Sequence, residues 1–229
     1  MTYDREQLLK TLENLPIYAN CNFGEENQDE VLAALNNKMF YDYDYAYGAT
    51  KLAIIPVDKD YVIKIPYTGT YNRNYYNEDD EYDETLDTGE WVDFCGAEDA
   101  DECWNYCSSE VNRYKIAEEY GFAICFAETR LLGDVHNFPI YVQEKCEILE
   151  HCHQTHTHSR EECNLYSLTY GCSINPNWLI DFSNYYGKEM LNSFLKFLTD
   201  MGWDDDLRSS NIGYIKDRPV IVDYSGYWE

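Results

Sequence analysis

Three short runs of strand-forming residues, separated by two tight turns, constrain the fold of this 229-residue chain more than any other feature. The runs cover residues 39–47, 51–56 and 60–66. Gly48-Ala49-Thr50 and Asp58-Lys59 separate them, and both sequences are typical of turns. A parallel neighbour would need a crossover of a dozen residues or more. We therefore predict an antiparallel meander.

Helical spacing and further strand patterns surround this meander. Leu8, Leu9 and Leu12 recur at helical intervals behind Asp4, a predicted N-cap with Gln7 three residues later. Gly121 is a predicted C-terminal stop for a later helix. The further elements expected are helices at 31–37, 102–120 and around 190–198, strands at 126–133 and 138–146, and a hairpin at 211–223 through Lys216-Asp217.

The charge balance excludes several classes of partner. The chain has 43 Asp and Glu against 17 Lys and Arg, a formal net charge of −26. Such a surface repels phosphate backbones and anionic lipids, so we expect neither nucleic-acid nor membrane binding. Residues 78–102 carry 13 acids and no Lys or Arg. We expect the segment 67–102 to be a solvated, partly mobile insertion.

The sequence also indicates in which cellular compartment the protein is expected. It has neither a run of eighteen apolar residues nor a signal-peptide core at its N-terminus. Its nine cysteines are odd in number and irregularly spaced, which fits reduced thiols better than a disulfide framework. We therefore expect a soluble protein of the cytoplasm.

One lysine stands in the middle of an apolar strand, in Tyr61-Val-Ile-Lys64-Ile-Pro66. Burying an unpaired ammonium costs about 2–5 kcal/mol, so Lys64 needs an anion unless its side chain reaches solvent at a strand edge. Phosphate groups of a ligand or an acidic side chain could supply that anion.

The C-terminal region joins a loop to a hairpin. Asp206-Leu-Arg-Ser-Ser-Asn211 places a carboxylate and an amide five residues apart, and Asp223-Tyr-Ser-Gly226 ends the hairpin. Phosphoryl transfer uses one carboxylate near the attacking hydroxyl, and an amide with a second carboxylate on Mg²⁺. Asp206 and Asn211 resemble the catalytic loop D-L-x-x-x-N of the protein-kinase-like fold, which includes aminoglycoside-phosphotransferase-like relatives. Asp223 resembles the first residue of its D-F-G turn.

The resemblance extends over about residues 40–227 and implies further roles in the same order. Gly48, Ala49 and Thr50 fall at the phosphate-covering loop, which has one glycine here instead of three. Lys64 matches the lysine that pairs nucleotide phosphates. Glu110 matches the glutamate that pairs this lysine, with Glu118 as the second choice. Glu144 and Cys146 lie in the segment that resembles the adenine-binding hinge.

The resemblance implies an α+β, protein-kinase-like fold with a truncated second lobe. Only three residues follow Gly226, where kinases continue into an activation segment and further helices. We expect an N-terminal helical segment (1–38), an N-lobe of antiparallel sheet and one crossing helix (39–146), and a helical C-lobe (147–229). Similarity to short, acidic, tyrosine-rich kinase-like sequences implies phage origin and a place in the host cytoplasm.

Two functions from different classes are then open. In the first, the chain binds Mg-ATP and transfers phosphate to a hydroxyl: Lys64 holds phosphates, Glu110 orients Lys64, Asp206 positions the hydroxyl, and Asn211 and Asp223 bind Mg²⁺. In the second, it is an inactive kinase-like protein that blocks or recruits a protein partner through its acidic surface, mimicking a nucleic-acid backbone.

Two cysteine-containing patterns carry weaker predictions. The stretch His151-Cys152-His153-Gln-Thr-His156-Thr-His158, with Cys163, has ligand types that Zn²⁺ prefers but no established zinc spacing, and an exposed polar loop explains it more simply. Cys103 and Cys107 lie one helical turn apart, and we interpret them as partly buried thiols.

Overall fold

The computed structural model describes residues 1–14, 43–47, 51–66, 70–72, 91–93, 105–149, 159–170, 174–204 and 207–224. The chain forms two compact units. The first contains Met1–Ser108 and Arg130–Val142, and the second contains Ser109–Thr129 and Gln143–Glu229. The chain therefore passes from one unit to the other after Ser108, after Thr129 and after Val142. Each unit has its own hydrophobic core.

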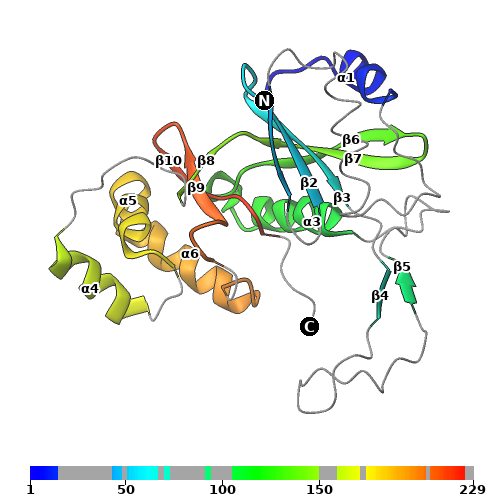
Figure 1. Ribbon diagram of the computed structural model, residues 1–229. Coiled ribbons are helices and arrows are strands. Elements are labelled where there is room, and N and C mark those ends of the chain that lie inside the picture. The colour runs from blue at the N-terminus through cyan, green and yellow to red at the C-terminus, as the bar shows by residue number, and fades with distance from the viewer. Residues whose placement is uncertain are drawn as a thin grey trace. The chain divides into compact units, whose positions relative to one another are not determined.

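A five-stranded sheet, in the order β1-β2-β3-β7-β6, forms the frame of the first unit (Figure 1). The antiparallel meander of its first three strands confirms the prediction, and β3 is the middle strand. His136 and Asn137 join β6 to β7 with φ angles of 52° and 65°, as a two-residue hairpin turn requires. The bounds are β1 (Tyr43–Tyr47), β2 (Lys51–Pro56), β3 (Tyr61–Pro66), β6 (Thr129–Val135) and β7 (Phe138–Glu144).

The helix α1 (Arg5–Leu12) packs on this sheet. Its cap is the predicted one, since the Asp4 carboxylate accepts a hydrogen bond from the Gln7 N–H at 3.1 Å. Arg5 Nε donates to the Leu132 carbonyl at 2.6 Å, and a β-carbon at Gly133 would lie 3.0 Å from the Leu9 side chain. The helix thereby covers a core of aliphatic and aromatic side chains: Leu8, Leu12, Leu52, Ile54, Tyr61, Ile63, Ile65, Leu132, Val135, Phe138, Ile140 and Val142.

The second unit packs helices against a small sheet. Strands β8 (Glu147–Ile148), β9 (Ile212–Ile215) and β10 (Arg218–Ile221) form an antiparallel sheet in the order β10-β9-β8. Helix α5 packs against α4, α6 and β10 (Figure 1). The helices are α3 (Tyr106–Glu119), the 3₁₀ helix η3 (Ala123–Cys125), α4 (Arg160–Tyr170), α5 (Pro176–Tyr186) and α6 (Lys188–Asp200).

Aromatic side chains fill the core of the second unit. Trp178, Phe182, Phe194 and Phe126 are almost completely buried, and the rings of Phe182 and Phe194 stack with centroids 5.1 Å apart. The Trp178 indole N–H donates to the Gly213 carbonyl at 3.2 Å, which ties α5 to β9. Large aromatic surfaces supply most of the apolar area that such a core removes from water.

Most predicted elements within the described residues are confirmed, with two differences. The predicted stop at Gly121 is confirmed: its φ is +81°, and the Phe122 N–H donates to the Ala117 carbonyl at 2.7 Å. The strand expected at 126–133 instead begins at Thr129, because η3 precedes it and Phe126 forms only an isolated bridge with Ile221. Helices α4 and α5 form where the sequence pattern predicted no element.

The acidic insertion is described only at two short strands. Strands β4 (Thr70–Asn72) and β5 (Trp91–Asp93) pair antiparallel within the segment 67–102, where the sequence pattern predicted no strand. The helix predicted at 31–37 and the boundary predicted at residue 38 lie outside the described residues. Among the described helices, none combines the length and the apolar character needed to cross a membrane.

Candidate functional site

The two predicted metal-ligating residues of the C-terminal hairpin lie together in the second unit. Asn211 directly precedes β9, and Asp223 follows the end of β10. The Asn211 carbonyl accepts hydrogen bonds from the N–H groups of Val222 at 2.8 Å and Asp223 at 3.4 Å. Antiparallel pairing of the strands brings these residues to the same end of the hairpin. The backbones of a residue with an amide side chain and a residue with a carboxylate side chain are thereby adjacent.

The loop before Asn211 is anchored by its own contacts. The Asn211 side chain is 7% exposed, its Oδ1 accepts from Ser210 Oγ at 3.1 Å, and its N–H donates to the Arg208 carbonyl at 2.8 Å. Leu207 is buried in the core of the unit. Asp206, the predicted catalytic carboxylate, lies outside the described residues, so its role stays a prediction.

Glu110 lies on α3 and is completely buried, with 0% of its surface exposed. One of its carboxylate oxygens accepts from Thr129 Oγ1 at 3.1 Å and lies 3.5 Å from Gln143 Nε2. Glu118, the second choice for the same role, is exposed. Of these two glutamates, Glu110 is therefore the one shielded from water, where charge interactions are stronger.

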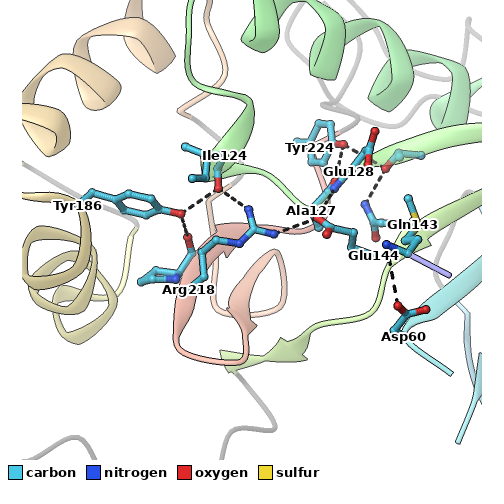
Figure 2. A network of polar contacts seen from close by, with 12 residues as sticks. Asp60, Ile124, Ala127, Glu128, Gln143, Glu144, Tyr186, Arg218 and Tyr224 are labelled. Carbon is cyan, nitrogen blue, oxygen red and sulfur yellow. Dashed lines mark hydrogen bonds and ion pairs between the residues drawn. The ribbon is translucent and has the colours of Figure 1, made fainter. Parts of the chain in front are cut away.

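Gln143 and Tyr224 extend the contacts of Glu110 into a buried polar network, part of which Figure 2 shows. Gln143 Nε2 donates to Thr129 Oγ1 at 2.8 Å and to the Val222 carbonyl at 2.7 Å. The Tyr224 hydroxyl lies 2.7 Å from the Ala127 carbonyl and 3.0 Å from Thr129 Oγ1. The sequence-based reasoning did not single out Thr129, Gln143 or Tyr224 as network members, although Gln143 is a polar residue inside an apolar strand.

Burial also fixes protonation states in this unit. It raises the pKa of Tyr224 well above 10, and the nearby Glu110 carboxylate adds to the effect. Tyr224 is therefore a neutral hydrogen-bond donor at physiological pH. Burial likewise raises the pKa of the Cys125 thiol to about 12. Cys125 remains protonated at neutral pH, and a protonated thiol is a poor nucleophile.

Two lysines of the first unit are buried on one face of the sheet. Lys64 is 5% exposed and Lys51 is 8% exposed. Lys64 lies opposite Ala53 in the pairing of β3 with β2, and Lys51 stands two residues before Ala53. Because side chains alternate between faces, both lysines are on the face opposite Ile63 and Leu52, which enter the core. The sequence-based reasoning placed Lys51 at the end of the stretch Tyr47-Gly48-Ala49-Thr50-Lys51, which resembles the phosphate-covering loop, but gave it no role of its own.

The predicted hinge residues differ in their surroundings. The Glu144 N–H donates to the Glu128 carbonyl at 3.0 Å, and the Glu144 carboxylate binds Arg218 Nη2 at 3.0 Å, as seen in Figure 2. An adenine contact at Glu144 would therefore have to use its carbonyl oxygen. Cys146 is half-buried and packs against Ala127, Val220 and Val222. Gly48, Ala49 and Thr50 lie outside the described residues.

The donor set at the hairpin suits Mg²⁺. This ion takes oxygen ligands, usually from one or two carboxylates together with substrate phosphates and water, and Asn211 and Asp223 supply one amide oxygen and one carboxylate. The described part of the chain contains no group of three or more His, Cys, Asp or Glu side chains able to hold a metal ion by themselves. Residues 151–158, on which the zinc prediction depends, lie outside it. Cys163 contacts Asn177 Oδ1.

Comparisons with protein-family models, with curated proteins and with solved structures found no match to this chain.

Proposed function

We propose that this chain is a kinase-like domain that binds ATP with Mg²⁺ and transfers a phosphoryl group to a hydroxyl of an acceptor. The observation that carries the proposal is the pairing of Asn211 with Asp223 through the Asn211 carbonyl. In the proposal, the amide oxygen of Asn211 and the carboxylate of Asp223, together with phosphate oxygens and water, are the oxygen ligands of Mg²⁺. When bound, the ion neutralises charge on the phosphates.

In this proposal the remaining residues bind and orient the nucleotide. Lys64 and Lys51 bind phosphate oxygens, and Glu110 pairs with Lys64. Two observations support these roles: Lys64 and Lys51 are buried on one sheet face, and Glu110 is buried in the second unit.

The acceptor and the base of the nucleotide have separate binding elements in the proposal. Asp206 orients the acceptor hydroxyl and accepts its proton. Gly48, Ala49 and Thr50 cover the phosphates, while the Glu144 carbonyl and the Cys146 backbone bind adenine. Apart from the proton transfer to Asp206, these groups act by positioning, which supplies much of the catalysis in phosphoryl transfer.

A thermal-shift experiment tests the nucleotide site. ATP with Mg²⁺ at about one hundred times the Kd stabilises a folded protein by about 2.7 kcal/mol, which corresponds to about 5–10 °C for a domain of this size. We expect that shift in the wild type and expect Asp223→Ala to abolish it. Asp217→Ala is the matched control, because Asp217 is an exposed acid in the turn of the same hairpin.

A transfer experiment separates turnover from binding. We expect label from γ-³²P-ATP to reach an acceptor in the wild type and to be lost in Asp206→Asn. A wild type that shows no thermal shift at millimolar Mg-ATP would contradict the proposal. A shift without any transfer would favour the alternative of an inactive kinase-like binding protein.

A further inference from the structure

The segment that carries Asp223 lies beyond the strand ladder. Strand β10 ends at Ile221, so residues 222–224 have no strand partner among the described elements. Other contacts hold the residues on either side of Asp223. The Val222 N–H donates to the Asn211 carbonyl, and the Val222 carbonyl accepts from Gln143 Nε2 at 2.7 Å. Both backbone polar groups of the residue before Asp223 are therefore held.

The residue after Asp223 is held through its side chain. The Tyr224 hydroxyl contacts the Ala127 carbonyl at 2.7 Å and Thr129 Oγ1 at 3.0 Å, and the Tyr224 ring packs edge-on against Phe126. Tyr224 is 5% exposed. Asp223 thus stands between two fixed residues, while its own side chain is only half-buried.

Thr129 connects the contacts on the two sides of Asp223. Its hydroxyl donates to the buried Glu110 carboxylate at 3.1 Å, and its oxygen lies within hydrogen-bond distance of both Gln143 and Tyr224. Thr129 and Gln143 are each 1% exposed. Hydrogen bonds that end on a carboxylate in a dry interior are stronger than neutral ones, and linked bonds reinforce each other.

We propose that Gln143, Thr129 and Tyr224 are positioning residues that hold Asp223 in the orientation needed to bind Mg²⁺ on the nucleotide. This inference rests on the proposed function and assigns a role to three residues that the sequence did not predict to be part of the site. None of the three residues touches the metal or the phosphates in this scheme. They act through the backbone on either side of Asp223.

The test measures how strongly Mg²⁺ and ATP reinforce each other's binding. The Kd of ATP is determined in EDTA and in saturating MgCl₂, and the ratio of the two values is the coupling between metal and nucleotide. We expect Tyr224→Phe and Thr129→Val to lower this ratio about two- to tenfold, the range set by one hydrogen bond. The Kd in EDTA should stay unchanged, and Asp223→Ala should remove the coupling.

Two controls separate positioning from general destabilisation. Tyr186→Phe removes a partly buried hydroxyl that lies within hydrogen-bond distance of the Ile124 and Pro219 carbonyls, outside the network, and should leave the ratio unchanged. Thr129→Ser keeps the hydroxyl and should retain the wild-type ratio. Both comparisons use only variants that melt cooperatively. If Thr129→Val does not fold, Tyr224→Phe, which loses a single oxygen atom, is enough to test the positioning role.

The possible outcomes distinguish the two proposals. A wild-type ratio of one would overturn the proposed metal site and the positioning role with it. A wild-type ratio well above one that Tyr224→Phe leaves unaltered would overturn the positioning role alone. The positioning role would also be overturned if Tyr186→Phe and Tyr224→Phe lowered the ratio equally, because the decrease would then result from a general loss of stability.

Discussion

Gly213 of β9 lies directly against the backbone of Glu147 in β8. A β-carbon on Gly213 would overlap the Glu147 carbonyl oxygen and lie 3.0 Å from the Ile148 α-carbon. Backbone atoms cannot move aside as a flexible side chain can, so a glycine is required for β8 and β9 to pair this closely.

We therefore expect Gly213→Ala to destabilise the protein by about 1–3 kcal/mol, as overpacking does elsewhere. Denaturant unfolding followed by circular dichroism measures the change. Gly202→Ala is the comparison: no atom lies within 4 Å of its added β-carbon, and only the positive φ of +65° opposes it, at about 1–2 kcal/mol. A Gly213→Ala variant as stable as the wild type would contradict the close pairing.

Lys216 is a second position where the backbone limits the side chain. It lies in the turn between β9 and β10 with a φ of +59°, a region that glycine and asparagine occupy most readily. We expect Lys216→Gly to raise stability by about 0.5–1 kcal/mol and the Tm by a few degrees. Asp217→Gly, at the next residue, has no positive φ to relieve and should give no gain. A lower Tm for Lys216→Gly would show that the turn does not need this conformation.

Tyr114 gives a prediction for alkaline pH. Burial, followed by the charges of Glu128 and Glu118, raises its pKa from 10.0 to about 12. Between these values the folded state keeps a proton that the unfolded state loses, so stability falls as pH rises from about 10 to about 12. Tyr114→Phe removes this contribution, and its unfolding free energy should fall less steeply over that range. Equal slopes for variant and wild type, measured by urea unfolding, would contradict the shift.

Substitution of Lys51 tests whether this face of the sheet binds phosphate. If the buried Lys51 and Lys64 both bind phosphates, Lys51→Gln should weaken ATP binding about tenfold, because a charge-assisted hydrogen bond is lost. Lys59→Gln is the control: Lys59 lies in the turn before β3, pairs with Asp58 at 2.7 Å and is exposed. Fluorescence titration with ATP measures both. Equal affinities of Lys51→Gln and Lys59→Gln would remove Lys51 from the site.

The elements predicted correctly are those with strong local patterns. Strands β2 and β3 follow from apolar runs between turn residues, and α1 follows from its leucine spacing and the Asp4 cap. Helix α5 was missed despite a local signal. Asn175 accepts a hydrogen bond from the Asn177 N–H, and Pro176 occupies the first turn, a combination that starts helices. The polar stretch before it obscured the apolar positions of Trp178 and Phe182.

The candidate site was predictable only in part. Asn211 and Asp223 could be placed together because a short hairpin joins the two ends of the segment. Thr129, Gln143 and Tyr224 come from distant parts of the sequence, and no spacing rule links them. The usable signal was the one applied to Lys64: a single polar residue inside an apolar strand needs a partner. Applied to Gln143, the same rule would have indicated a buried hydrogen bond.

The threefold passage of the chain between the two units limits how either can be studied alone. The core of the first unit needs Leu132, Val135, Phe138, Ile140 and Val142, which come after residues 109–129 of the second. A single cut between residues 12 and 224 therefore divides the core of at least one unit between two fragments. Isolating either unit without residues of the other would require joining its pieces with a designed linker or permuting the gene, because each unit is made of two separate stretches of the chain.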